Sequence, residues 1–127
     1  KVQWMPIMPR KEILYLIKNS SVGIGEFYHD DVMWGGTGWE ILSQGKPLIQ
    51  GFRKNNNQFK KDYGFEPPPI FAANSINSIY KNLLELYDDF TLRKKSGQLS
   101  LDWYLKNNAH VAAKKIIDLL EQKNKVE

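Results

Sequence analysis

At 127 residues, the chain has the size of one domain with a buried core, and we expect residues 1–127 to form a single domain. Its 42% hydrophobic and 25% charged residues are typical of a globular protein, and no stretch resembles a membrane span or a signal peptide. The absence of cysteine excludes disulfides and thiolate chemistry, and it favours a cytoplasmic location. Because the chain begins with Lys1 rather than Met, we expect it to be part of a longer protein.

The net charge of +4 is spread over the chain, with small clusters at Lys60–Lys61, Arg93–Lys95 and Lys114–Lys115. A nucleic-acid-binding protein usually concentrates its cations in one stripe and places aromatic residues among them. We therefore interpret the charge as solvated helix faces and expect no nucleic-acid partner. A peripheral contact with anionic lipid on the cytoplasmic face remains open, because a basic surface is attracted to such a membrane.

The first predicted elements are a strand end, a helix and a short strand. Residues 2–4 suit the end of a strand, and Pro9 suits the first turn of a helix that continues to about Lys18. Residues 21–27 alternate small and apolar residues between turn formers, which predicts a short strand.

A glycine-rich loop and a short helix follow. Thr37 fits an N-cap and Glu40, three positions later, completes the spacing of a capping box. Gly45 fits the residue after the helix, and residues 46–50 then form a buried strand. Gly35, Gly36 and Gly38 surround the predicted N-cap, and because they have no side chains the backbone there is unusually accessible.

This arrangement predicts an anion site. Unpaired N–H groups and the helix dipole both favour negative charge at a helix N-terminus, and glycines let a ligand approach the backbone closely. Two simpler interpretations stay open: the glycines allow a tight turn, and Glu40 acts only as a capping residue.

The second half of the chain is predicted to contain a polar excursion, a strand and helices. Residues 51–63 are expected to form a surface loop, and residues 67–69 lead in extended form into a strand at 70–73. Asn74 or Ser75 caps the next helix, whose apolar stripe consists of Ile76, Ile79, Tyr80, Leu83, Leu84 and Tyr87.

The chain closes with a charged connection and a last helix. Residues 88–97 are expected to form that connection, with partial helical character. The last helix starts at about Leu101, and its apolar face consists of Leu105, Ala109, Ala112, Ile116, Leu119 and Leu120.

Short strands that alternate with helices predict an α/β fold with a parallel sheet and right-handed crossovers. Ligands of such sheets bind beyond the carboxyl ends of the strands, and the loop from Phe27 to Thr37 leaves one of these ends.

Other chemistry has weaker support. His29, Asp30 and Asp31 place a histidine beside two carboxylates, but their spacing matches no zinc pattern, and we expect no metal and no cofactor. The second histidine, His110, is far away in the sequence, and this argues against a hydrolase built on a nucleophile–histidine–acid triad.

Four segments together resemble the C-terminal, nucleotide-sugar-binding half of GT-B glycosyltransferases, the family often called glycosyl transferases group 1. The most specific segment is Trp34–Gly35 followed by Glu40–Ile49, which resembles the family pattern FG…EA-x-x-x-G-x-PVI. The others are Met8–Ile13 with Leu16–Ile17, Ser20–Ile24, and Leu101–Trp103 with the helix after it.

The resemblance implies an incomplete Rossmann-like domain, with a parallel sheet flanked by helices, that binds a nucleotide diphosphate-sugar donor. Glu40 would accept hydrogen bonds from the ribose hydroxyls, and Gly35, Gly36 and Thr37 would present backbone amides to the diphosphate. The family's sugar-contacting glutamate corresponds to Val32, eight positions before Glu40, and here Asp31 would replace it in preference to Asp30 or Glu26.

The resemblance also implies missing parts. The family's acceptor-binding N-terminal half, the first βα units and the Arg/Lys pair that neutralises the diphosphate would all precede Lys1. We therefore expect the longer protein to transfer a sugar to a glycan or lipid-linked acceptor, and this chain alone to be inactive, with no catalytic residue assigned. The alternatives are a non-catalytic interaction module on the same fold and a sugar-nucleotide epimerase.

Overall fold

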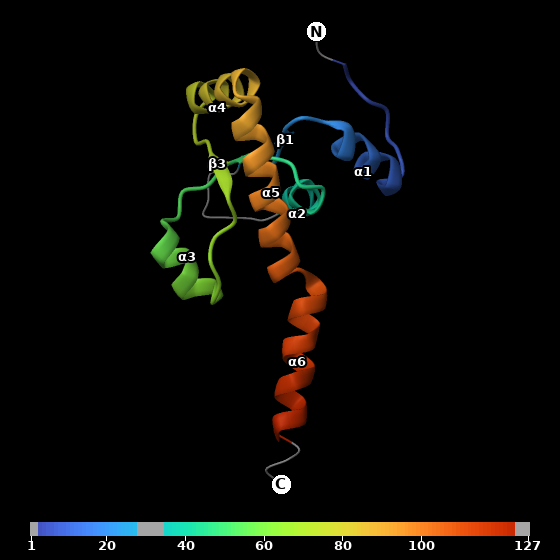
Figure 1. Ribbon diagram of the computed structural model, residues 1–127, viewed down its shortest axis with the longest axis vertical. Coiled ribbons are helices and arrows are strands. Elements are labelled where there is room, and N and C mark those ends of the chain that lie inside the picture. Colours follow the sequence, from blue (N-terminus) through green and yellow to red (C-terminus); the bar gives the residue numbers. More distant parts are fainter. Residues whose placement is uncertain (1–2, 28–34, 124–127) are drawn as a thin grey trace.

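The computed structural model describes residues 3–27 and 35–123 and has a mixed α/β fold (Figure 1). The elements in chain order are α1 (Arg10–Asn19), β1 (Gly23–Ile24), α2 (Gly36–Ser43), β2 (Leu48–Gln50), α3 (Asn56–Tyr63), β3 (Ile70–Ala72), α4 (Ile76–Asp88), α5 (Phe90–Asn107) and α6 (Ala109–Lys123).

The strands of the described residues form one parallel sheet in the order β1-β2-β3, as the alternation of strands and helices predicts. Leu48 of β2 pairs with Gly23 of β1 on one side and with Ile70 of β3 on the other. Helix α2 connects β1 to β2, and α3 connects β2 to β3. All three carboxyl ends therefore lie at the same edge of the sheet, where the N-terminus of α2 begins.

The two faces of the sheet carry separate apolar clusters because successive side chains of a strand point to opposite faces. On one face, Leu48 packs with Ile41 and Leu42 of α2 and with Trp103 of α5. On the other face, the neighbouring residue Ile49 packs with Ala73 and with Leu86 of α4. Helices thus cover both faces, as parallel sheets require.

The C-terminus of α2 ends as the sequence predicts. Gly45 has a φ of 64°, in the left-handed region that glycine adopts without strain. Its N–H donates to the Leu42 carbonyl at 3.0 Å, and the Lys46 N–H donates to the Ile41 carbonyl at 3.3 Å. This pair of bonds is a Schellman motif, and it turns the chain directly into β2.

Helices α2 and α5 pack at very close range. A Cβ atom built on Gly97 of α5 would lie 2.3 Å from the backbone oxygen of Gly45, which is too close for any side chain. The long helix α5 can therefore cross the end of α2 only because residue 97 is glycine.

The prediction of a surface loop at residues 51–63 is wrong in part, because this segment contains α3. Asn55 caps this helix by accepting a 2.8 Å hydrogen bond from the Gln58 N–H, and Gly64 ends it with a φ of 75°. Phe59 is 1% exposed and packs against the rings of Phe52 and Phe65. The asparagine run therefore marks a helix start, and a single aromatic residue anchors the helix to the body.

The prediction of a charged connection at residues 88–97 is wrong in part: its helical character is confirmed, but the segment is not a connection, because α5 begins at Phe90. The Asp89 carboxylate accepts a 2.8 Å hydrogen bond from the Leu92 N–H and caps the helix. The helix then continues to Asn107, past the predicted start at Leu101. The helix is interrupted at Asn108, and α6 begins at the next residue. The Asn108 side chain accepts hydrogen bonds from the amides of His110 and Val111 at the start of α6.

The apolar face predicted for the last helix does form a stripe, but it is exposed. Helix α6 extends from the end of α5 away from the sheet (Figure 1). Ile116, Leu119 and Leu120 are 60%, 65% and 59% exposed. In the described residues, the apolar face of α6 is therefore not part of either cluster.

Two predicted strands are shorter than expected or absent. The strand predicted at residues 21–27 contracts to the two residues of β1. Of the strand end predicted at residues 2–4, the structure describes Gln3 and Trp4, and neither belongs to a strand. Trp4 is 91% exposed and does not pack against the sheet.

Candidate functional site

The candidate site lies at the N-terminus of α2, beside the carboxyl end of β1. Gly35 is the N-cap, with an extended backbone at φ −72° and ψ 162°, and Gly36 is the first helical residue. The predicted N-cap at Thr37 is therefore wrong. Thr37 lies inside the first turn and is exposed, because the helix already starts at Gly36.

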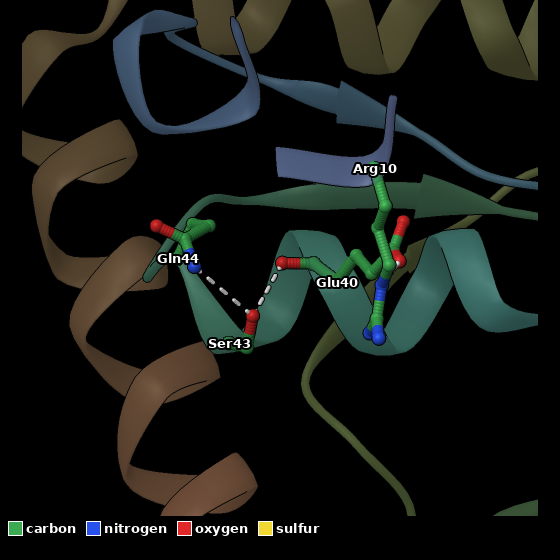
Figure 2. A network of polar contacts seen from close by, with 4 residues as sticks. All are labelled: Arg10, Glu40, Ser43 and Gln44. Carbon is green, nitrogen blue, oxygen red and sulfur yellow. Dashed lines mark hydrogen bonds and ion pairs between the residues drawn. The ribbon is translucent and has the colours of Figure 1, made fainter. Parts of the chain in front are cut away.

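Glu40 does not close a capping box. Its Oε1 atom lies 2.7 Å from Nε of Arg10 and accepts a hydrogen bond from it, as Figure 2 shows. The Glu40 side chain is 18% exposed, whereas that of Arg10 is 76% exposed. The carboxylate therefore faces the start of α1, and a cation from another helix takes the place of the expected backbone partner.

The end of the same helix carries a small network of polar contacts. The Ser43 hydroxyl donates to the Glu40 backbone oxygen at 2.7 Å, and Gln44 Nε2 donates to the Ser43 hydroxyl at 3.3 Å (Figure 2). These bonds satisfy a carbonyl near the C-terminus of α2. They use the backbone of Glu40 and leave its carboxylate to the contact with Arg10.

Glu26 reaches the N-terminus of α2 from the end of β1. A Cβ atom built on Gly35 would lie 1.9 Å from Oε1 and 2.0 Å from Oε2 of Glu26. Both carboxylate oxygens are therefore packed directly against the Cα of Gly35. The structure therefore brings Glu26 to the start of α2, whereas Asp30 and Asp31 lie outside the described residues.

Gln50 supplies a buried polar group beside this corner. It ends β2, is 2% exposed, and its Oε1 has no hydrogen-bond partner among the described residues. The same oxygen lies 2.4 Å from the position of a Cβ on Gly25, the residue that precedes Glu26. A buried acceptor without a donor is costly, so such an atom calls for a donor group.

A hollow at the carboxyl edge lies on the α4 side of the sheet. It has a volume of about 210 Å³ and is lined by Phe27, Gly51, Arg53, Ala73, Asn74, Ser75, Ile76 and Ile79. Asn74, one of the lining residues, bonds both backbone groups of Phe52, accepting from the N–H at 3.2 Å and donating to the carbonyl at 3.0 Å. Arg53 is the cation of this hollow.

Some of the predicted site residues lie outside the described residues. These are Asp31, Val32 and the neighbouring His29 and Asp30. Within residues 3–27 and 35–123, no group of three or more His, Cys, Asp or Glu side chains could hold a metal ion.

The structure thus brings Gly35, Gly36 and Thr37 together at one helix end, with Glu40 one turn further along. Arg10 as the partner of Glu40 and the buried Gln50 were not predicted from the sequence. Arg10 gives no signal, because the contact joins residues that are 30 positions apart. Gln50 could have been noticed as a polar residue at the end of an otherwise apolar strand.

None of the described helices combines the length and the apolar character that a membrane crossing needs. In comparisons with known proteins, no family model, no curated protein and no solved structure matches the chain. What the site can do therefore follows from its own residues.

Proposed function

We propose that the chain is the donor-binding domain of a glycosyltransferase, which moves a sugar from a nucleotide diphosphate-sugar to an acceptor. The observation that carries the proposal is the glycine-rich start of α2 at the carboxyl edge of a parallel sheet, with the half-buried Glu40 one turn inside the helix. This is the position where Rossmann-like sheets bind nucleotides.

Each group at this position suits one part of such a donor. The amides of Gly36 and Thr37 are among the first N–H groups of α2, which are unpaired within a helix and favour the diphosphate. The Glu40 carboxylate can accept from two vicinal ribose hydroxyls, and each charge-assisted bond of this kind contributes about 1.5–3 kcal/mol. Transfer then depends on electrostatic stabilisation of the departing diphosphate.

The remaining parts of the proposal concern the longer protein. The acceptor, a glycan or a lipid-linked molecule, would bind to an N-terminal half that precedes this chain, and Asp31 would contact the donor sugar. The protein would act in the cytoplasm, with a peripheral contact to the membrane through its basic surface.

Calorimetric titration of the full-length protein with UDP and GDP tests the proposal. We expect Glu40→Ala to weaken binding of the preferred nucleotide by about 10- to 100-fold, which corresponds to the loss of about one bond to a carboxylate. Glu85→Ala, an exposed carboxylate on α4, is the matched control and should bind like the wild type.

Arg10→Ala separates a direct role of Glu40 from a structural one. If Glu40 contacts the ribose itself, loss of Arg10 leaves most of the nucleotide affinity in place. Equal losses in both variants would show that the ion pair only shapes the domain. Unchanged affinity in Glu40→Ala would exclude the ribose contact.

A non-catalytic interaction module is the second candidate, and the exposed apolar side chains favour it. Ile76, Tyr80 and Tyr87 of α4 are 84%, 63% and 79% exposed, and α6 carries a further apolar stripe. Such surfaces are typical of protein contacts. This candidate predicts that the full-length protein binds neither UDP nor GDP.

A further inference from the structure

A basic hollow lies at the amino ends of the strands, whereas α2 starts at their carboxyl ends. It has a volume of about 510 Å³ and lies where the chain enters the sheet, since Ser20 and Ser21 come shortly before β1 and Lys46 shortly before β2. Arg93 and Lys94 of α5 also line it. Among the described residues that line this basic hollow, three are cations and none is acidic.

The described residues leave the charge of the basic hollow without a carboxylate partner. Neither Lys46 nor Lys94 forms an ion pair within the described part of the chain. The acidic residues on this part of α5 have other partners, because Asp89 caps the helix and Asp102 accepts from Gln98 Nε2 at 2.8 Å. Cations that gather in a hollow repel one another, and an anion bound among them removes this repulsion.

Arg93 is held in place and still has donors to offer. Its Nη1 donates to the Leu86 carbonyl and, at 2.6 Å, to the Tyr87 carbonyl, and its Cζ lies 5.5 Å from the centre of the Phe90 ring. A guanidinium donates from each of its nitrogens, and these bonds use only Nη1. A positioned arginine loses little freedom when it binds a phosphate, whose geometry its planar fork fits.

An apolar groove adjoins the basic hollow. It has a volume of about 450 Å³ and shares Ser21 and Arg93 with the basic hollow. The rest of its lining is apolar or aromatic and consists of Val22, Tyr80, Leu83, Leu84, Leu86 and Tyr87. Tyr80 and Leu84 are 63% and 42% exposed, so solvent reaches this groove. Arg93 therefore lies at the junction between a basic and an apolar compartment.

Two joined compartments of this kind fit an amphiphile. We infer that the basic hollow and the apolar groove together bind one anionic lipid, whose phosphate lies among Lys46, Arg93 and Lys94 and whose hydrocarbon chain lies along α4. A protein segment in the apolar groove would leave the cations unpaired, whereas a lipid phosphate complements the basic hollow and its chain fills the groove.

The lipid would attach the domain to a membrane rather than serve as the sugar acceptor, because α2 starts at the opposite edge of the sheet. Lys95, which lines an adjoining hollow with Lys94, extends the basic surface. The inference rests on the proposed function only for its membrane contact, to which it gives a defined place. Nucleotide binding does not enter it.

Calorimetric titration of the full-length protein with water-soluble lipids tests the inference. Dihexanoyl and dioctanoyl phosphatidic acid have the same head and differ only in chain length. Below their micelle-forming concentrations, we expect the longer lipid to bind about tenfold more tightly, because each further buried CH₂ group strengthens binding. Inorganic phosphate should bind most weakly. Equal affinities for phosphate and both lipids would overturn the inference, since the site would then hold an anion without a chain.

Substitutions test the two compartments separately. Lys46→Gln and Lys94→Gln should each weaken the binding of dioctanoyl phosphatidic acid by about fivefold, and Lys115→Gln on α6 should stay within about twofold of the wild type. Tyr80→Ser should reduce the difference between the two lipids and leave phosphate binding unchanged. Ile116→Ser, which removes a side chain of similar exposure from α6, is its control. Wild-type affinity in both Lys46→Gln and Lys94→Gln would show that the inference is wrong.

Co-flotation of the full-length protein with vesicles extends the test to a bilayer. We expect binding to vesicles of phosphatidylcholine with phosphatidic acid, little binding to phosphatidylcholine alone, and loss of binding when Lys46→Gln and Lys94→Gln are combined. If the wild type binds no lipid and Tyr80→Ser lowers the Tm more than Ile116→Ser does, another part of the longer protein covers the groove and the inference is wrong.

A titration with UDP separates this inference from the proposed nucleotide site. Lipid binding that is lost in the combined lysine variant, while its UDP affinity is unchanged, supports both. A wild type that binds UDP but no lipid overturns the lipid site alone. A wild type that binds lipid but neither UDP nor GDP overturns the nucleotide site and leaves the lipid site in place.

Discussion

Nε of Arg10 and Oε1 of Glu40 lie 2.7 Å apart, and this ion pair joins the start of α1 to the centre of α2. The two residues are 30 positions apart in the sequence. The pair directs the Glu40 carboxylate toward α1 rather than toward the amides of its own helix. A cation is thus already present beside the carboxylate that we propose to bind ribose.

Arg10→Ala should lower the free energy of unfolding only slightly. The guanidinium is 76% exposed, and ion pairs of this kind contribute about 0.2–1 kcal/mol. The loss should shrink in 1 M NaCl, where charges are screened. Urea denaturation at low and high salt measures both effects, with Lys11→Ala as the control. A loss that is independent of salt would show that packing of the Arg10 side chain matters more than its charge.

Gly97→Ala should destabilise the protein markedly. The added Cβ would lie 2.3 Å from the Gly45 backbone oxygen, and α5 would have to move away from α2 to make room. Overpacking of this kind costs about 1–3 kcal/mol, occasionally more.

Gly36→Ala is the matched control for this substitution. No described atom lies within 4 Å of a Cβ at Gly36, and alanine is the better helix former by about 1 kcal/mol. Thermal denaturation should therefore show a lower Tm for Gly97→Ala and an equal or higher Tm for Gly36→Ala. Equal Tm values for Gly97→Ala and the wild type would mean that the two helices do not pack at the observed range.

The pKa of Asp62 should depend on Lys54. Lys54 Nζ lies 2.6 Å from Asp62 Oδ2, and this hydrogen bond is the main reason why the pKa of Asp62 falls below its ordinary value of 3.8; Gln58 lowers it further. Because the folded-state pKa is the lower one, the contact stabilises the fold above the ordinary pKa, and this contribution is lost as the pH falls through the folded-state value.

Lys54→Met should therefore raise the pKa of Asp62 toward 3.8, as measured by NMR titration of its carboxyl carbon. Lys60→Met is the control, because Lys60 pairs with Glu66 instead. An unchanged Asp62 pKa in Lys54→Met would show that the ion pair does not persist in solution.

Ile116→Ser should leave the stability of the chain nearly unchanged. Ile116 is 60% exposed on α6, and surface substitutions usually change stability by less than about 0.5 kcal/mol. Leu86→Ala, at a position with 0% exposure, should instead cost about 2–5 kcal/mol. Chemical denaturation of both variants gives the comparison. A loss above about 1 kcal/mol for Ile116→Ser would reveal that another surface covers α6.

The elements with local signals could be predicted from the sequence. Gly45 ends α2 as expected, because only its neighbours and its own backbone decide this turn. Ser75 caps α4, where Ser78 completes a capping box in the place of the usual acidic residue. The apolar strands at residues 46–50 and 70–73 contain β2 and β3 in parallel pairing.

Elements that depend on distant contacts could not be predicted. Helix α3 has a polar sequence, and Phe59 holds it only because the rings of Phe52 and Phe65 lie beside it. The charged segment at residues 90–97 is part of helix α5, because Asp89 caps the helix and Gly97 lets it pack against Gly45.

The sequence by itself determined the α/β class, the alternation of strands and helices, and the glycine-rich start of α2, since each depends on periodicity or on residues a few positions apart. Only the tertiary structure decided which groups meet around α2. Arg10 of α1 pairs with Glu40 in the middle of α2, and Glu26 at the end of β1 lies against Gly35, because the pairing of the strands and the packing of α1 on α2 bring them there. Such contacts leave no local pattern, because the intervening chain can vary without changing either partner.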